Sequence, residues 1–80
     1  MKHSNRAFQQ TLKRKRYEFG YSQRDLAAKL GIKASHVAYL ENGRRRPSLA
    51  LLVRLAKTLN VRPGKLALQG IPELAEFGVK

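Results

Sequence analysis

The side chains of this sequence that could do chemistry are mostly cations. Lysine and arginine contribute 17 residues against 5 aspartates and glutamates, which gives a formal net charge of +12 at pH 7. Three arginines stand in a row in the stretch ENGRRRPS, residues 41–48, between a glycine and a proline. On a small folded protein such a single-sign field selects polyanionic partners, and nucleic acid is the first candidate.

The other polar residues do not indicate a catalytic or metal site. The sequence has no cysteine, and its two histidines, His3 and His36, lie far apart in a chain with few carboxylates. No metal and no other cofactor is therefore expected. Ser35 precedes His36, but neighbours on a helix point about 100° apart and no orienting acid is near, so no catalytic serine is predicted. We do not expect an enzyme.

Length and composition predict one small domain over residues 1–80. Hydrophobic residues make up 42% of the 80 residues, too many for a disordered basic tail. No apolar run is long enough for a signal peptide or a membrane span, so a soluble intracellular protein is expected. We expect the core of the domain to cover about residues 6–68, followed by a tail of residues 69–80.

Apolar residues recur at steps of three and four, which predicts an all-α protein of five short helices. The expected ranges are about 5–19, 23–30, 34–42 and 49–59, with a fifth helix from residue 63 and one further turn in the tail. Ser22 and Asp25 form a capping-box-like pair at the start of the second helix. Glycines or Asn60 follow the first four helices, as left-handed C-terminal positions require.

The apolar residues predict which side of each helix is buried. In the first helix the stripe is Phe8, Leu12 and Phe19, and the KRKR run at residues 13–16 interrupts it, so Lys15 or Arg16 must lie near the buried side. The expected inner face of the fourth helix is Leu49, Leu52, Val53, Leu55, Ala56 and Leu59. The apolar residues of the tail either fold back on the first and fifth helices or form a dimer contact; they are Ile71, Leu74, Phe77 and Val79.

Residues 23–42, QRDLAAKLGIKASHVAYLEN, meet the requirements of two helices that cross steeply after a tight turn. The small Ala27 stands where the second helix passes over the first, and Gly31 permits the positive φ of the turn. Val37 and Leu40 supply the apolar side that faces back onto the first helix. These positions together predict a helix-turn-helix unit.

The sequence resembles the phage Cro and lambda-type repressor family of helix-turn-helix proteins. The resemblance rests on GYSQRDLAAKLGI, on VAYLENGRRRPSLALLVRLAKTLNV and on Arg16, and it covers roughly residues 6–68. It implies a compact five-helix bundle, a lambda-repressor-like DNA-binding domain, whose third helix enters the DNA major groove. It also implies a structural ion pair between Arg16 and Glu41 inside the domain.

The resemblance also assigns the DNA contacts. Base contacts are expected from Ala34, Ser35 and Tyr39. Backbone contacts are expected from Gln23, Lys33, His36, Asn42, Arg44 and Arg46, with Arg45 the weaker candidate of the arginine run. None of the base-facing side chains can form the arginine–guanine or glutamine–adenine pairs that discriminate bases most strongly. DNA shape and backbone contacts are therefore expected to carry more of the specificity.

The expected function is sequence-specific binding of double-stranded DNA by a transcriptional regulator, a repressor that acts as a homodimer on the nucleoid of a bacterial or phage-infected cell. Three alternatives stay open. The first is an antitoxin-type DNA-binding module with a protein toxin as second partner. The second is an RNA-binding or general nucleic-acid-coating protein driven by charge. The third, an amphipathic membrane-surface protein, is disfavoured by helices punctuated by glycine and proline and by the absence of tryptophan.

Overall fold

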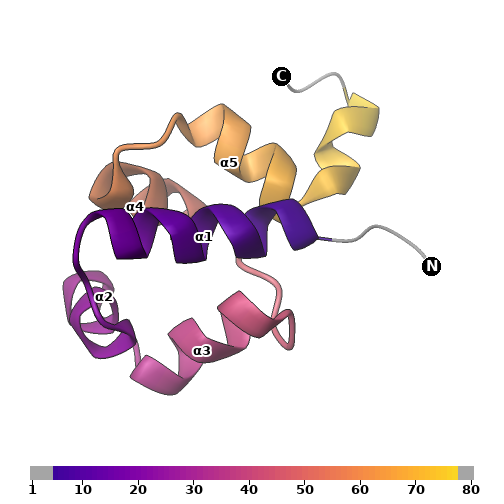
Figure 1. Ribbon diagram of the computed structural model, residues 1–80. Helices are drawn as coiled ribbons and strands as arrows, with labels where there is room; N and C mark the ends of the chain where they lie inside the picture. The colour runs from indigo at the N-terminus through magenta and orange to yellow at the C-terminus, as the bar shows by residue number, and fades with distance from the viewer. Residues whose placement is uncertain (1–4, 78–80) are drawn as a thin grey trace.

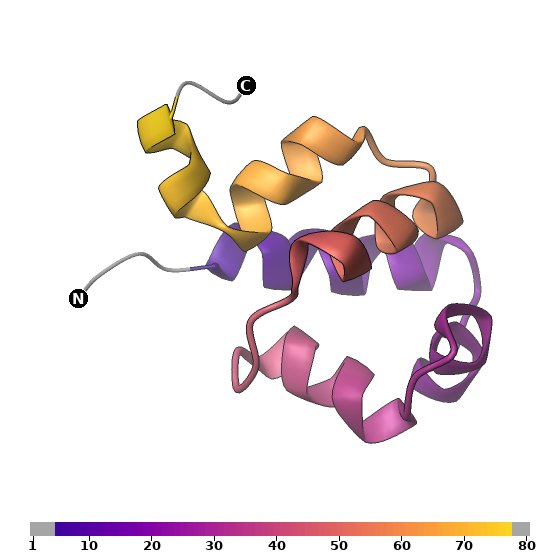
Figure 2. The same ribbon diagram turned by 180° about the vertical axis from the view of Figure 1, so that it is seen from behind.

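The computed structural model describes the backbone of residues 5–77 and the side chains of residues 5–74. The elements in chain order are α1 (Arg6–Glu18), α2 (Gln23–Leu30), α3 (Ala34–Asn42), α4 (Leu49–Leu59), α5 (Pro63–Gly70) and the 3-10 helix η1 (Pro72–Phe77). The expected all-α fold is confirmed, and α3 has the bounds that the sequence predicts. In both views the α2–α3 pair lies below α1 and α5 lies above it, while α4 overlaps α1 in projection and also contacts α2 (Figures 1 and 2). None of the described helices is long and apolar enough to cross a membrane.

Local hydrogen bonds fix where the helices begin. The Ser22 hydroxyl accepts a hydrogen bond from the Asp25 backbone N–H, and the Asp25 carboxylate accepts one from the Ser22 backbone N–H, each at 2.9 Å. The expected capping box is thus confirmed. The backbone N–H of Ser22, and after it the side chain, lowers the pKa of Asp25. This cap therefore stabilises the fold at neutral pH and loses that contribution as the pH falls through the lowered pKa.

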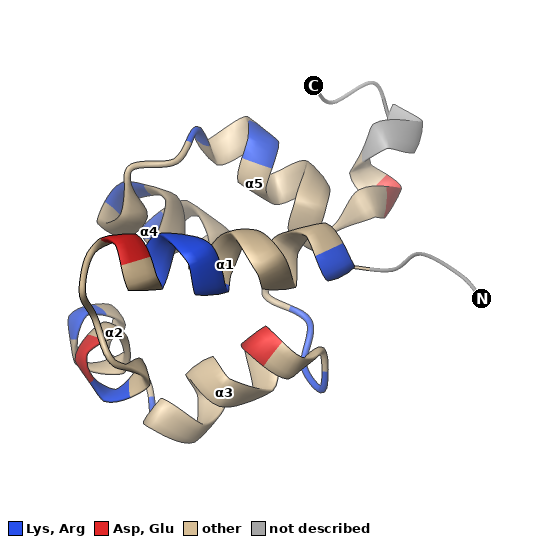
Figure 3. Cartoon of the chain, viewed as in Figure 1, with Lys and Arg blue, Asp and Glu red and all other residues tan. Residues whose placement is uncertain are grey.

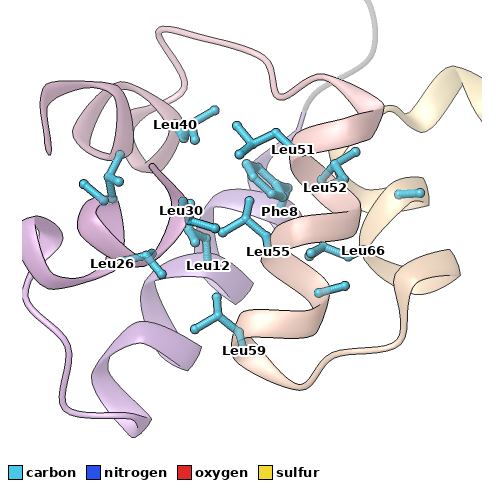
Figure 4. Packing of buried hydrophobic residues seen from close by; sticks show 14 residues of the cluster. Phe8, Leu12, Leu26, Leu30, Leu40, Leu51, Leu52, Leu55, Leu59 and Leu66 are labelled. Atoms are coloured by element: carbon cyan, nitrogen blue, oxygen red, sulfur yellow. The ribbon is translucent and has the colours of Figure 1, made fainter. Parts of the chain in front are cut away.

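One cluster of buried apolar side chains from all five α-helices forms the core. Leucines of α2, α3 and α4 converge on Phe8 and Leu12 of α1 (Figure 4). The cluster consists of Phe8, Leu12, Leu26, Ala27, Leu30, Val37, Leu40, Leu51, Leu52, Leu55, Ala56, Leu59, Leu66 and Ala67. Each large side chain that is removed from water here contributes about 1.5–3 kcal/mol to folding. The core therefore fixes the orientation of α2 and α3 relative to α1.

The structure corrects the expected inner face of α4. Leu49 and Val53, assigned to the core from the sequence, are 53% and 39% exposed, whereas Leu51 is 6% exposed. Residues four apart lie on the same face of a helix. Leu51 therefore shares the inward face with Leu55, and Leu49 and Val53 share a neighbouring face that looks outward. The apolar residues of α4 cover more of its circumference than the core occupies.

The prediction for Phe19 is also wrong. Helix α1 ends at Glu18, and Phe19 occupies its C-cap position rather than a further turn. The ring of Phe19 is 42% exposed and contacts the ring of Tyr21, with 5.6 Å between the centroids. Of the residues that interrupt the stripe of α1, Arg16 is the buried one, at 5% exposure.

The described part of the tail folds back onto the bundle through η1, which contacts α5. Ile71 and Leu74 pack against the core cluster. The chain enters this turn through Gly70, where an added Cβ would lie 2.8 Å from Leu52 and 2.9 Å from Pro47, so this close approach requires glycine. Of the two expectations for the tail, Ile71 and Leu74 thus agree with the one in which the tail folds back onto the bundle. The side chain of Phe77 and the whole of Val79 lie outside the described part of the chain.

A matched pair of substitutions tests the corrected face of α4. Leu55→Ala removes a side chain that is 0% exposed, and we expect it to lower the free energy of unfolding by about 2–5 kcal/mol. Leu49→Ala removes the same atoms from the outward face and should change it by less than about 0.5 kcal/mol. Urea unfolding measures the free energy of unfolding of both variants. Equal losses for the two variants would contradict the assignment.

Candidate nucleic-acid interface

Helices α2 and α3 meet through a turn that leaves one face of α3 exposed. Gly31 ends α2 in the left-handed conformation with φ 71°, and the Ile32 N–H then donates to the Ala27 carbonyl at 3.0 Å. Val37 and Leu40 turn inward and are both 0% exposed. The pairing of α2 with α3 therefore uses the apolar side of α3 and leaves its polar side to solvent.

A buried ion pair joins α1 to α3. The guanidinium of Arg16 donates to Glu41 twice, from Nε to Oε2 at 2.5 Å and from Nη2 to Oε1 at 3.0 Å. A third donor of Arg16 reaches the Tyr21 carbonyl at 2.9 Å. The carboxylate of Glu41 raises the pKa of Arg16, since it stabilises the charged form. The polar groups of the pair are thus satisfied inside the protein, as a buried charge requires.

The side chain of Gln23 belongs to the same network. Its Nε2 donates to Glu41 Oε1 at 3.0 Å, so the amide that the sequence assigns to DNA points between the helices instead. Gln23 is nevertheless the first residue of α2. Backbone N–H groups at such a helix start lack intrahelical partners and attract anions. A contact between Gln23 and a phosphate would therefore use the backbone N–H.

The exposed side of α3 forms one wall of a concavity of about 420 Å³, which we call the α3 groove. The residues that line it are Ile32, Lys33, Ser35, His36, Tyr39 and Arg45. Tyr39 is 38% exposed and Ser35 is exposed, while His36 is half-buried. Ala34, the third expected base contact, is half-buried and packs against the core. Its methyl group therefore offers less surface to a partner than Ser35 or Tyr39.

The loop after α3 is folded back onto the end of that helix. Gly43 has φ 82°, and the backbone N–H groups of Arg44 and Arg45 both donate to the Tyr39 carbonyl, at 2.9 and 3.3 Å. The Asn42 side chain also accepts a hydrogen bond from the Arg44 N–H at 3.0 Å. The loop backbone is thus held by α3. Of the expected backbone contacts, Asn42 has its side-chain oxygen engaged in this turn and Arg44 is exposed.

The three consecutive arginines have different surroundings. Arg45, the weaker candidate from the sequence, lines the α3 groove. Arg46, which the sequence assigns to phosphate, donates from Nη2 to Glu73 Oε1 in η1 at 2.5 Å. The Glu73 carboxylate raises the pKa of Arg46. Sequence reasoning missed this pair because the two residues are 27 positions apart and share no local pattern.

Positive charge lies at both ends of α3 and is absent from the helix itself. Figure 3 shows α3 without lysine or arginine, with Lys33 before its start and the arginine loop after its end. A second concavity, of about 620 Å³, is larger than the α3 groove and lies mostly along α1. The residues that line it are Arg6, Gln9, Gln10, Lys13, Arg14, Tyr17, Glu18 and Glu41. Both of its carboxylates already pair with arginines of α1. Among the described residues no three histidine or carboxylate side chains gather where they could hold a metal ion.

Comparison with known proteins agrees with this geometry. A family model described as helix-turn-helix matches residues 12–66, more than half of the chain. The chain belongs to the helix-turn-helix family, in its Cro/C1 type. The matched region begins in α1 and ends in α5, so it contains α2, α3 and the arginine loop.

Two relatives come from the archaeon Archaeoglobus fulgidus, and each is described as an uncharacterized HTH-type transcriptional regulator. One is 36% identical over 47 residues, which cover 59% of this chain and 67% of the relative. The other is 31% identical over 51 residues, which cover 64% of this chain and 72% of the relative. Both of these relatives are thus archaeal proteins.

Substitution of Glu41 by glutamine tests the buried pair. Glu41→Gln leaves the Arg16 charge buried without a counter-charge, and we expect the free energy of unfolding to fall by about 3–5 kcal/mol. Glu18→Gln is the matched control, because Glu18 pairs with Arg14 and Lys15 on the exposed side of α1. That change should cost less than about 1 kcal/mol. A similar small loss for both variants in urea unfolding would show that the pair is not structural.

Proposed function

We propose that this protein is a sequence-specific, double-stranded DNA-binding regulator of transcription that places α3 in the major groove. The observation that carries the proposal is the exposed polar side of α3, held between cations in a chain of net charge +12. A helix fits the width of the major groove, where each base pair presents a distinct pattern of donors, acceptors and methyl groups. Uncharged side chains on α3 suit base edges, and the flanking cations suit the phosphates on either side.

The contacts divide by chemistry. Ser35 can donate or accept a hydrogen bond at a base edge, Tyr39 offers a ring and a hydroxyl, and the Ala34 methyl can touch a thymine methyl. The proposed backbone contacts are Gln23 through its N–H, and Lys33, His36, Asn42, Arg44 and Arg46 through their side chains. These contacts supply affinity that does not depend on sequence and fix the register of α3.

We further propose that the protein acts as a homodimer and as a repressor in the cytoplasm, with no enzymatic step. One α3 can contact only a few base pairs, and two copies related by a two-fold axis would read half-sites about 34–36 Å apart. Occupancy of promoter DNA by such a dimer blocks other proteins sterically. The two archaeal relatives, described as transcriptional regulators, support the regulatory part of the proposal.

The antitoxin-type alternative would gain support from an exposed apolar tail. Ile71 and Leu74 instead pack against the core, so the described part of the tail does not provide that support. Charge-driven coating of nucleic acid would need no ordered α3 groove. The ordered loop and the mixed polar lining of the groove favour specific recognition over coating.

Selection of bound sequences from a pool of random duplexes, at two salt concentrations, tests the proposal. We expect an enriched inverted repeat, because two α3 helices read two half-sites. Ser35→Ala and Tyr39→Ala should each reduce the difference in binding free energy between the enriched duplex and random DNA, by about 1–3 kcal/mol at most. Binding with a steep salt dependence and no enriched sequence would overturn specific recognition in favour of coating.

Glu73 provides a test of the Arg46 contact. Because Arg46 must leave its carboxylate to bind a phosphate, Glu73→Gln should raise the affinity for every duplex by up to about five-fold. It should also steepen the dependence of log affinity on log salt by up to about 0.9, the equivalent of one phosphate contact. Glu18→Gln makes the same change in net charge on α1 and should have the smaller effect. Equal effects of the two variants in binding titrations would show that only net charge matters.

A further inference from the structure

Helix α3 lacks the side chains that read guanine most strongly. Its sequence, ASHVAYLEN, contains no arginine or lysine, and the outward side of α3 offers the groove a serine, a histidine and a tyrosine. Guanine presents two acceptors, O6 and N7, on one edge in the major groove, and a planar guanidinium can donate to both at once. A protein that reads bases only through these three residues would recognise guanine weakly.

The structure brings one arginine to this side of α3 from outside the helix. Arg45 lines the α3 groove together with Ser35 and Tyr39. Its backbone N–H donates to the Tyr39 carbonyl at 3.3 Å, so the start of its side chain is fixed relative to Tyr39. The exposed guanidinium thus starts from a defined point beside the surface proposed to face the bases.

The two neighbouring arginines do not compete for this position. Arg46 is directed to Glu73 of η1, at 2.5 Å. Arg44, held through its N–H by the Asn42 side chain at 3.0 Å, is not among the residues that line the groove. Of the three arginines in the loop, Arg45 is therefore the one that lines the α3 groove.

We propose that Arg45 is a specificity-determining residue that reads a guanine in the major groove, next to the bases under Ser35 and Tyr39. This inference rests on the proposed function, because it requires α3 in the major groove. The guanidinium donates to O6 and N7 of one guanine, from a backbone position that is held by the Tyr39 carbonyl. The strongest base discrimination then comes from the loop, whereas α3 sets the register. A phosphate contact by Arg45 would raise affinity without changing which sequence is preferred.

Selection from random duplexes with four proteins tests this role. The proteins are the wild type, Arg45→Ala, Arg45→Lys and the matched control Arg44→Ala from the same loop. We expect one guanine position of the wild-type motif to lose its preference in both Arg45 variants, by about 5- to 150-fold, because lysine is a point charge and cannot form the paired hydrogen bonds. Arg44→Ala should bind more weakly and keep the motif. All four should unfold at the same urea concentration, since both arginines are exposed.

Three results are distinguishable. If Arg45→Ala selects the same motif as the wild type, the inference is overturned and the proposed function stays intact. No motif for the wild type overturns the proposed function and this inference with it. Where the guanine position is lost, replacing that guanine by 7-deazaguanine removes the N7 acceptor from the duplex. This replacement should weaken the wild type and leave Arg45→Ala unaffected; equal weakening of both proteins would assign the guanine to another residue and overturn the inference.

Discussion

The buried pair of Arg16 and Glu41 is the interaction on which the geometry of the site depends. Removing two charges from water costs several kcal/mol per ion, and the mutual attraction offsets this only where the remaining donors and acceptors are satisfied. Here the Tyr21 carbonyl and the Gln23 amide complete the hydrogen bonds. Because these groups come from α1, α3, the start of α2 and the connection before it, one network sets the position of α3 relative to the rest of the bundle.

The acidic residues are too few to neutralise the cations, and those with described side chains are already engaged in contacts within the protein. The carboxylates with described side chains lie on arginine, lysine or a helix start: Glu18, Asp25, Glu41 and Glu73. A net charge of +12 destabilises a compact chain through self-repulsion, and the continuous apolar core offsets that cost. A polyanion bound along α3 would relieve this repulsion, so the net positive charge is consistent with the proposed binding of DNA.

Much of the fold is predictable from sequence because its signals are local. The Ser22–Asp25 cap and the glycines after α2 and α3 mark helix ends, and the structure places those ends as predicted. The exposure of Leu49 and Val53 was not predictable, since the apolar residues of α4 cover a wider face than the core does, and the sequence does not show which part of that face stays in solvent. Arg16 and Glu41 were found through the family resemblance. No local sequence pattern indicates the pair of Arg46 and Glu73, because only the tertiary fold brings these two residues together.

The arginine run shows why composition cannot assign roles within a site. Identical side chains at three consecutive positions have different surroundings because the backbone is held at both ends. The Tyr39 carbonyl accepts hydrogen bonds from the N–H groups of Arg44 and Arg45, and Pro47 is buried at the start of α4. Between these fixed points stand three arginines, of which Arg45 lines the α3 groove and Arg46 pairs with Glu73. The position of each arginine between these fixed points, and not the arginine content, therefore separates a side chain in the α3 groove from one paired with Glu73.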